Sequence, residues 1–163
     1  SFAFLIVTPV STVAMGLILF NNANYVGAGA ATLGLVAAAA VLSIGTFRAK
    51  SKGASIAIIL GAIKLMMPNC ARRPQLFLPI LTTAAITGLS GYFLGIQGTH
   101  ESAGFGIIGL IGPTKAYEMN PGSLVQIILA FFVIPFTAAF LADGLYSDVL
   151  KLYKSEVYRP ENY

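Results

Sequence analysis

The feature that most constrains this chain is a set of four apolar segments, each about long enough to cross a lipid bilayer. A helix needs about 20 apolar residues to span about 30 Å of hydrocarbon, and this predicts transmembrane helices over residues 1–20, 25–47, 76–98 and 123–142. Of the 163 residues, 56% are hydrophobic and 10% are charged, whereas soluble domains carry about 25% charged residues. The sequence therefore predicts an all-α, multi-pass integral membrane protein.

A shorter apolar stretch, residues 53–68, runs into the polar sequence PNCARRP. As a helix of about 15 residues it would be about 22 Å long, which is too short to cross. We expect Pro68 to end this helix and Asn69 to hydrogen-bond the backbone groups that the proline leaves unpaired. Non-helical backbone at membrane depth usually lines an aqueous pathway, so we predict a re-entrant segment beside such a pathway.

Lys64 lies on the small-residue side of this short helix, opposite Ile56, Ile59 and Ile63. Two interpretations stay open for its ammonium group. It either reaches toward the lipid head groups or faces a hydrated cavity, where it would contact a substrate.

A second short segment, residues 103–120, is interrupted by four glycines and a proline: Gly104, Gly106, Gly109, Gly112 and Pro113. Its apolar part is again too short to span. Glycine permits backbone conformations and close approaches that other residues obstruct, and exposed amides and carbonyls can then serve a ligand. We predict a second re-entrant segment, entering from the opposite face.

The basic residues indicate how these segments are threaded through the membrane. If residues 53–68 return to their own side, eight of the ten Lys and Arg residues share one side: Arg48, Lys50, Lys52, Arg72, Arg73, Lys151, Lys154 and Arg159. The positive-inside rule makes this side cytoplasmic. We therefore expect a transmembrane domain over residues 1–144 and an amphipathic cytoplasmic tail over 145–163, with an interfacial helix over 145–153.

The second predicted span is rich in small residues. Small residues recur at three- and four-residue steps over residues 25–47, which predicts a helix buried among its neighbours.

In the first predicted span, Ser11 and Thr12 follow Pro9. Their hydroxyls either repair the hydrogen bonding that the proline disrupts or line a binding site.

Several classes of function are disfavoured. The basic clusters alternate with apolar segments rather than forming a stripe with aromatic residues, so we expect no nucleic-acid partner. A single cysteine, Cys70, and a single histidine, His100, offer no metal constellation. We expect no metal and no cofactor. No nucleophile is paired with a base, and we expect no enzyme acting alone.

Five segments together resemble one known family: TPVSTVA, GAGAATLGLV, LMMPNCARRPQLFLPILTTAAITG, AGFGIIGLIGP and FFVIPFTAAFLADGLYSDVLK. Their order and spacing resemble the sugar-specific IIC subunits of the bacterial phosphoenolpyruvate-dependent phosphotransferase system. The similarity covers most of the chain. Family members are longer and carry further spans ahead of this region, so the chain resembles their C-terminal portion.

The resemblance implies a sugar permease component in the bacterial cytoplasmic membrane, among membrane lipids, working with cytoplasmic IIA and IIB proteins that supply the phosphoryl group. It also implies substrate contacts from residues within the matching motifs: Ser11, Thr12, Pro68, Asn69, Gly104, Gly106, Gly109 and Gly112. We expect the chain to self-associate as a homo-oligomer or to be the remainder of a longer chain.

Two alternative functions stay open. The weakly polar interior would suit a membrane-embedded receptor or regulatory protein that binds an apolar or lipid-like ligand between its helices. A packing subunit of a larger membrane assembly would need little more than the small-residue helix over residues 25–47.

Overall fold

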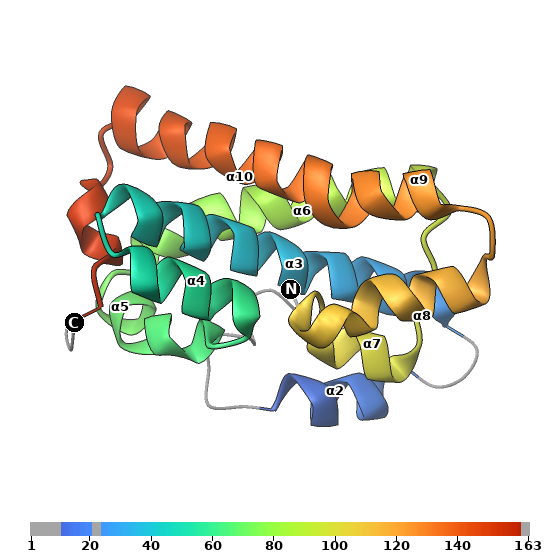
Figure 1. Ribbon diagram of the computed structural model, residues 1–163. Coiled ribbons are helices and arrows are strands. Elements are labelled where there is room, and N and C mark those ends of the chain that lie inside the picture. The colour runs from blue at the N-terminus through green and yellow to red at the C-terminus, as the bar shows by residue number, and fades with distance from the viewer. Residues whose placement is uncertain (1–10, 21–23, 161–163) are drawn as a thin grey trace.

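The computed structural model describes residues 11–20 and 24–160, and within these ranges the regular structure is entirely helical. One helix, α3 (Tyr25–Arg48), runs through the centre of the molecule, and other helices pack around it (Figure 1). Every residue from Ala28 to Thr46 is buried apart from Ala30 and Ile44. The predicted burial of this small-residue helix is therefore confirmed, because its alanines and glycines let neighbouring backbones approach closely.

Three helices in the described part of the chain are long and apolar enough to cross a membrane: α3, Pro74–Phe93 and Leu124–Val149. The second helix consists of the short turn η2 (Pro74–Leu76) followed by α6 (Phe77–Phe93). The third joins four helical pieces end to end: α9 (Leu124–Ile128), η4 (Leu129–Val133), α10 (Ile134–Gly144) and η5 (Leu145–Val149). Both pack against α3.

These helices correspond to three of the four predicted spans, with different ends. The third span was predicted to reach residue 98, but α6 ends at Phe93. Gly95 then adopts a φ of +68°, which reverses the chain, and the Gly98 N–H donates to the Tyr25 carbonyl at 3.0 Å. The last span is longer than predicted. The π-helical turn η4 lies just before Pro135, which lacks an N–H to donate.

The first predicted span, residues 1–20, lies partly outside the described residues. Its described part forms α2 (Thr12–Leu19), an eight-residue helix.

Shorter helices form two helical hairpins (Figure 1). The first hairpin consists of α4 (Lys52–Leu60), η1 (Ile63–Met66) and α5 (Met67–Arg72). The second hairpin consists of α7 (His100–Phe105), η3 (Ile108–Leu110) and α8 (Ile111–Met119). They correspond to the two segments that were predicted to be re-entrant.

Pro68, which was expected to end a helix, lies instead in a first turn, and so does Pro113. Pro68 stands at the start of α5 and Pro113 in the first turn of α8, where a missing N–H costs no helical hydrogen bond. The helix preceding Pro68 ends earlier, at Gly61, which has a φ of +125°. The prediction of one continuous helix from residue 53 to Pro68 was therefore wrong.

The C-terminal segment does not form the helix expected over residues 145–153. Helical structure ends at Val149, Lys151 has a φ of +50°, and the chain continues to the short turn η6 (Ser155–Tyr158). This segment crosses the end of the bundle at which α3 ends (Figure 1). Tyr153 and Tyr158 are buried, because their hydroxyls find partners inside the protein and their rings pack against each other.

Candidate functional site

The first hairpin starts at the end of α3 and runs back along it. Helix α4 begins four residues after Arg48, and its Ser55 hydroxyl donates to the Ser43 carbonyl on α3 at 2.9 Å. Both serines are buried. After Gly61, which has the left-handed φ that favours glycine, η1 and α5 return to the end from which α4 started (Figure 1).

The second hairpin enters from the opposite end of the molecule. Helix α7 ends at Gly106, and positive φ angles of about +60° follow at Gly109 and Leu110. The Gly112 N–H donates to the Gly106 carbonyl at 2.9 Å and closes the turn. Helix α8 then leads back toward the end where α7 began (Figure 1).

The tips of the two hairpins touch. A Cβ atom at Gly61 would lie 3.2 Å from Cγ2 of Ile108, which belongs to the turn of the second hairpin. That turn also lies against α3, because a Cβ at Gly106 would lie 2.8 Å from the Cβ of Leu35. Two short hairpins from opposite ends therefore meet beside the middle of the central helix (Figure 1).

Helix α2 packs along the second hairpin. The Thr12 hydroxyl donates to the Gly104 carbonyl at 2.8 Å, and a Cβ at Gly104 would lie 2.5 Å from the Cα of Val13. Ser11 is exposed and caps α2, since its hydroxyl accepts from the Ala14 N–H at 3.3 Å. The Thr12 hydroxyl thus bonds the backbone of another helix.

The structure separates the predicted site residues into two groups. Thr12, Gly104, Gly106 and Gly112 lie together where α2, α3 and the second hairpin meet, and Gly109 is exposed at the hairpin tip. Lys64 is exposed on η1, within the returning part of the first hairpin.

Pro68 and Asn69 form the second group, at the basic end of the molecule. Asn69 is buried, and its side-chain amide donates to the carbonyls of Val157 and Arg159 at 2.8 and 2.9 Å. Pro68 is exposed beside it. The amide N–H groups of Asn69 therefore hold the C-terminal segment, not the backbone groups beside Pro68 that the sequence predicted as its partners.

Sequence reasoning missed a charged network at this same end. Arg48 pairs with Asp143 at 2.9 Å and with Asp148 at 3.0 Å. The other oxygen of Asp143, which is fully buried, accepts from the Tyr153 hydroxyl at 2.9 Å, and that hydroxyl accepts from Tyr158 at 3.1 Å. Burial raises the pKa of both tyrosines above the ordinary value, so they remain protonated donors. The sequence signal was an aspartate directly after an apolar span, which needs a partner if it is buried.

A second missed contact joins the central helix to the second hairpin. The hydroxyls of Thr32 and Ser102 are 3.2 Å apart and buried. Thr32 donates to the Ala28 carbonyl at 2.8 Å, while Ser102 and Thr99 cap the start of α7 reciprocally. This contact fixes the position of α7 against α3.

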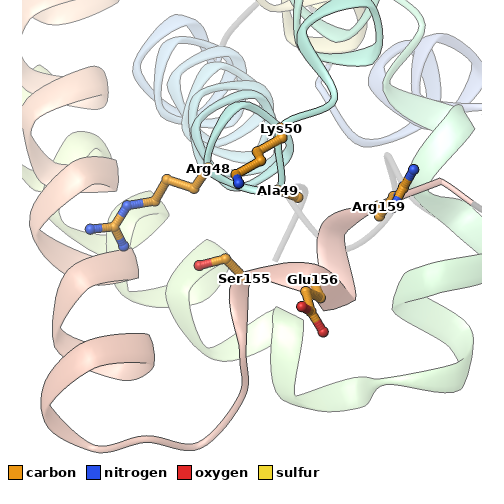
Figure 2. Close-up of a pocket in the computed structure, with 6 residues that line it drawn as sticks. All are labelled: Arg48, Ala49, Lys50, Ser155, Glu156 and Arg159. Atoms are coloured by element: carbon orange, nitrogen blue, oxygen red, sulfur yellow. The ribbon is translucent and has the colours of Figure 1, made fainter.

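Two adjoining clefts open at the basic end. The larger, of about 720 Å³, is lined by Arg48, Ala49, Lys50, Ser155, Glu156 and Arg159 (Figure 2). The smaller, of about 310 Å³, is lined by Asn69, Arg72, Arg73, Glu156, Val157 and Arg159. The clefts share Glu156 and Arg159, so the C-terminal segment forms the ridge between them.

Within residues 11–20 and 24–160, no group of His, Cys, Asp or Glu side chains could hold a metal ion. Cys70 is buried, and burial raises the pKa of its thiol to about 12. The thiol therefore stays protonated and a poor metal ligand at neutral pH.

Comparison with known protein families matches residues 1–159 to the phosphotransferase system EIIC family. The chain belongs to this family. The resemblance seen in the sequence motifs is thereby confirmed. Searches of the curated proteins and of the solved structures found no match. As an EIIC protein, the chain is a membrane component of a phosphotransferase transport system, and it works with other components of that system and a sugar substrate.

Proposed function

We propose that this EIIC protein is the sugar permease component of a phosphoenolpyruvate-dependent phosphotransferase system in the bacterial cytoplasmic membrane, and that its sugar passes where the two hairpin tips meet. The observation that carries the proposal is the contact between Gly61 and Ile108. It joins two short segments that start from opposite ends of the molecule (Figure 1). Opposed hairpins of this kind are how several transporters build a site near the middle of the bilayer.

We propose that the backbone of the second hairpin supplies polar groups despite its apolar side chains. Sugars are recognised through their hydroxyl groups, which need hydrogen-bond donors and acceptors. The turn at Gly106 and Gly109 leaves the regular helix, and backbone groups outside a helix can serve a ligand. Gly109 and Leu110 are exposed at the tip. We propose that the backbone around these residues contacts the sugar.

The other predicted residues take different roles in this proposal. Thr12 and Gly104 fix α2 against the second hairpin, and Ser11 lies at the start of α2 beside them. We propose that Lys64, which is exposed on η1, contacts the substrate from the first hairpin. We propose that Asn69, which binds the C-terminal segment, acts as a positioning residue, with Pro68 setting the start of its helix.

The orientation follows from the charge distribution. The three basic clusters stand at the end of α3, at the end of α5 and in the C-terminal segment, and these lie at one end of the bundle (Figure 1). We propose that this end is cytoplasmic. It would then face the IIA and IIB proteins that supply the phosphoryl group.

The test is sugar uptake into vesicles that contain the full chain together with its phosphotransferase partners. Uptake should require phosphoenolpyruvate and should deliver phosphorylated sugar. Gly109→Val should lower the uptake rate at least about tenfold, because its φ of +60° disfavours a β-branched residue. The control is Gly88→Val, at a helical glycine with open space around it. Uptake that is unchanged by Gly109→Val would contradict a site at the hairpin tip.

One observation favours a second candidate, a receptor for a lipid-like ligand. An apolar cleft of about 500 Å³ lies between α6 and α10, lined by residues that include Ile86, Ile134 and Leu141. Under this alternative, native mass spectrometry of the purified protein would show a stoichiometric apolar ligand. The vesicles would then show no sugar uptake.

A further inference from the structure

We propose that the two clefts at the basic end form one binding site for a small phosphomonoester, a molecule of the size of a phosphorylated sugar. Cavities of about 300–1,000 Å³ are typical of small-molecule sites, and the clefts measure about 720 and 310 Å³. They adjoin along Glu156 and Arg159, which line both.

The charge of the lining selects an anion. Among the described residues that line the clefts, five are basic and Glu156 is the only acidic one: the basic ones are Arg48, Lys50, Arg72, Arg73 and Arg159. Arg48 is already balanced by Asp143 and Asp148, and Figure 2 shows its side chain directed away from Glu156 and Arg159. Of the other lining residues, Lys50, Arg73 and Arg159 alone outnumber the Glu156 carboxylate, which gives the clefts a positive charge.

The donors are of the kind that binds phosphate. Arginine binds phosphate oxygens in a bidentate manner, and lysine adds a point charge. A phosphomonoester carries a charge of about −1.5 to −2 at pH 7. The Ser155 hydroxyl lies on the same wall as Glu156 in the larger cleft (Figure 2). A neutral sugar carries no charge that could pair with these cations.

The wall that carries Arg159 is held in place before any ligand binds. Asn69 donates to the carbonyls of Val157 and Arg159. Tyr158 lies between these two residues in the sequence and is fully buried against α3. Its ring packs so closely on Gly45 that a Cβ atom added at Gly45 would lie 2.5 Å from Cδ1 of the ring. Fixed backbone reduces the conformational entropy that binding must overcome. The C-terminal segment therefore presents Arg159 and Glu156 in a defined position.

The identity of the natural ligand rests on the proposed function. A phosphotransferase permease releases its sugar as a phosphomonoester on the side where the phosphoryl group is supplied, and the clefts lie at the end we propose to be cytoplasmic. The anion site itself rests only on the clefts and their charge.

The test measures binding of glucose 6-phosphate, inorganic phosphate and glucose to the full chain in nanodiscs of phosphatidylcholine. We expect glucose 6-phosphate and inorganic phosphate to bind in a manner that depends on Arg159, whereas any binding of glucose should not depend on Arg159. Arg159→Gln should weaken binding about tenfold, since a hydrogen bond to a charged group is worth about 1.5–3 kcal/mol. Glu156→Gln should strengthen binding several-fold, which a misfolded protein would not do. Lys115→Gln removes an equal charge from α8, away from the clefts, and should change nothing.

A second arm distinguishes a soluble ligand from a lipid head group. Phosphatidylglycerol is added to the nanodiscs, and its retention by the wild-type and Arg159→Gln proteins is compared by native mass spectrometry. Glucose 6-phosphate binding that depends on Arg159 supports a soluble phosphomonoester. Arg159-dependent retention of phosphatidylglycerol, without glucose 6-phosphate binding, supports a lipid phosphate. The inference is overturned if all variants bind equally or if neither compound binds. If sugar uptake fails while anion binding is intact, only the proposed function is overturned.

Discussion

Gly104 shows how a single residue sets the distance between two helices. Its Cα lies so close to α2 that an added Cβ would be 2.5 Å from the Cα of Val13, and its carbonyl accepts from Thr12. The neighbouring atoms are backbone, which cannot move aside as a flexible side chain can. Gly88 on α6 is the opposite case, because no atom lies within 4 Å of its added Cβ.

This contrast predicts opposite effects of the same substitution. Gly104→Ala should lower the free energy of unfolding by about 1–3 kcal/mol, as overpacking does in close-packed interiors. Gly88→Ala should raise it by about 0.5–1 kcal/mol, because glycine is unfavourable within a helix. Thermal unfolding in detergent measures both. A Gly104→Ala protein as stable as wild type would mean that α2 does not pack closely on α7.

Asn69 is the residue on which the C-terminal segment depends. Asn69→Ala leaves two carbonyls without their donor and should destabilise that segment by about 1–3 kcal/mol. Amide hydrogen exchange over residues 153–159 should then accelerate about tenfold or more. Asn120→Ala, at an exposed asparagine in the loop after α8, is the matched control. Unchanged exchange in Asn69→Ala would rule out its anchoring role.

At the scale of elements, the sequence predicted segment types better than it predicted their boundaries. The two short hairpins were expected because their apolar runs are too short to cross, and length is a property of the sequence alone. The helix break at Gly61 was missed because Pro68 carries the stronger local signal, yet a proline is tolerated in the first turn of a helix. The path of the C-terminal segment was missed for another reason: it is held by hydrogen bonds from a residue distant in sequence, Asn69, to the carbonyls of Val157 and Arg159.

The C-terminal segment should respond to alkaline pH. Burial raises the pKa of Tyr153 and Tyr158 above the ordinary value of about 10. Their stabilising effect is therefore complete below about pH 10 and is lost as the pH rises through the raised values. We expect tyrosine absorbance and tryptic cleavage of the tail to show a joint transition above about pH 10.

Substitutions assign this transition to the buried pair. Tyr158→Phe keeps the ring against Gly45 but removes one ionising hydroxyl, and it should move the tail's release to higher pH. Tyr92→Phe, at an exposed tyrosine of α6, should leave it in place. Release at the same pH in all three proteins would show that these tyrosines do not control the segment.

At the scale of the whole molecule, the described part of the chain places two long helices and two opposed hairpins around α3. The sequence predicted a helix buried at the centre from its small residues, and the structure confirms it. It did not predict which polar groups would meet, such as Arg48 with Asp143 or Asn69 with the C-terminal segment, because these pairs are about 90 residues apart. Such contacts depend on how the spans pack against each other, and a local sequence motif does not encode that packing.

The central claim is that the first hairpin returns to the side from which it starts, and labelling of positions 50 and 72 in intact cells tests it most directly. Lys50→Cys and Arg72→Cys are made in a Cys70→Ala background, with Lys115→Cys as the marker of the opposite side. If the first hairpin returns to its own side, membrane-impermeant thiol reagents should label positions 50 and 72 only after the cytoplasm is opened, and position 115 before. Labelling of positions 50 and 72 from different sides would mean that residues 53–68 cross the bilayer, and would contradict the account.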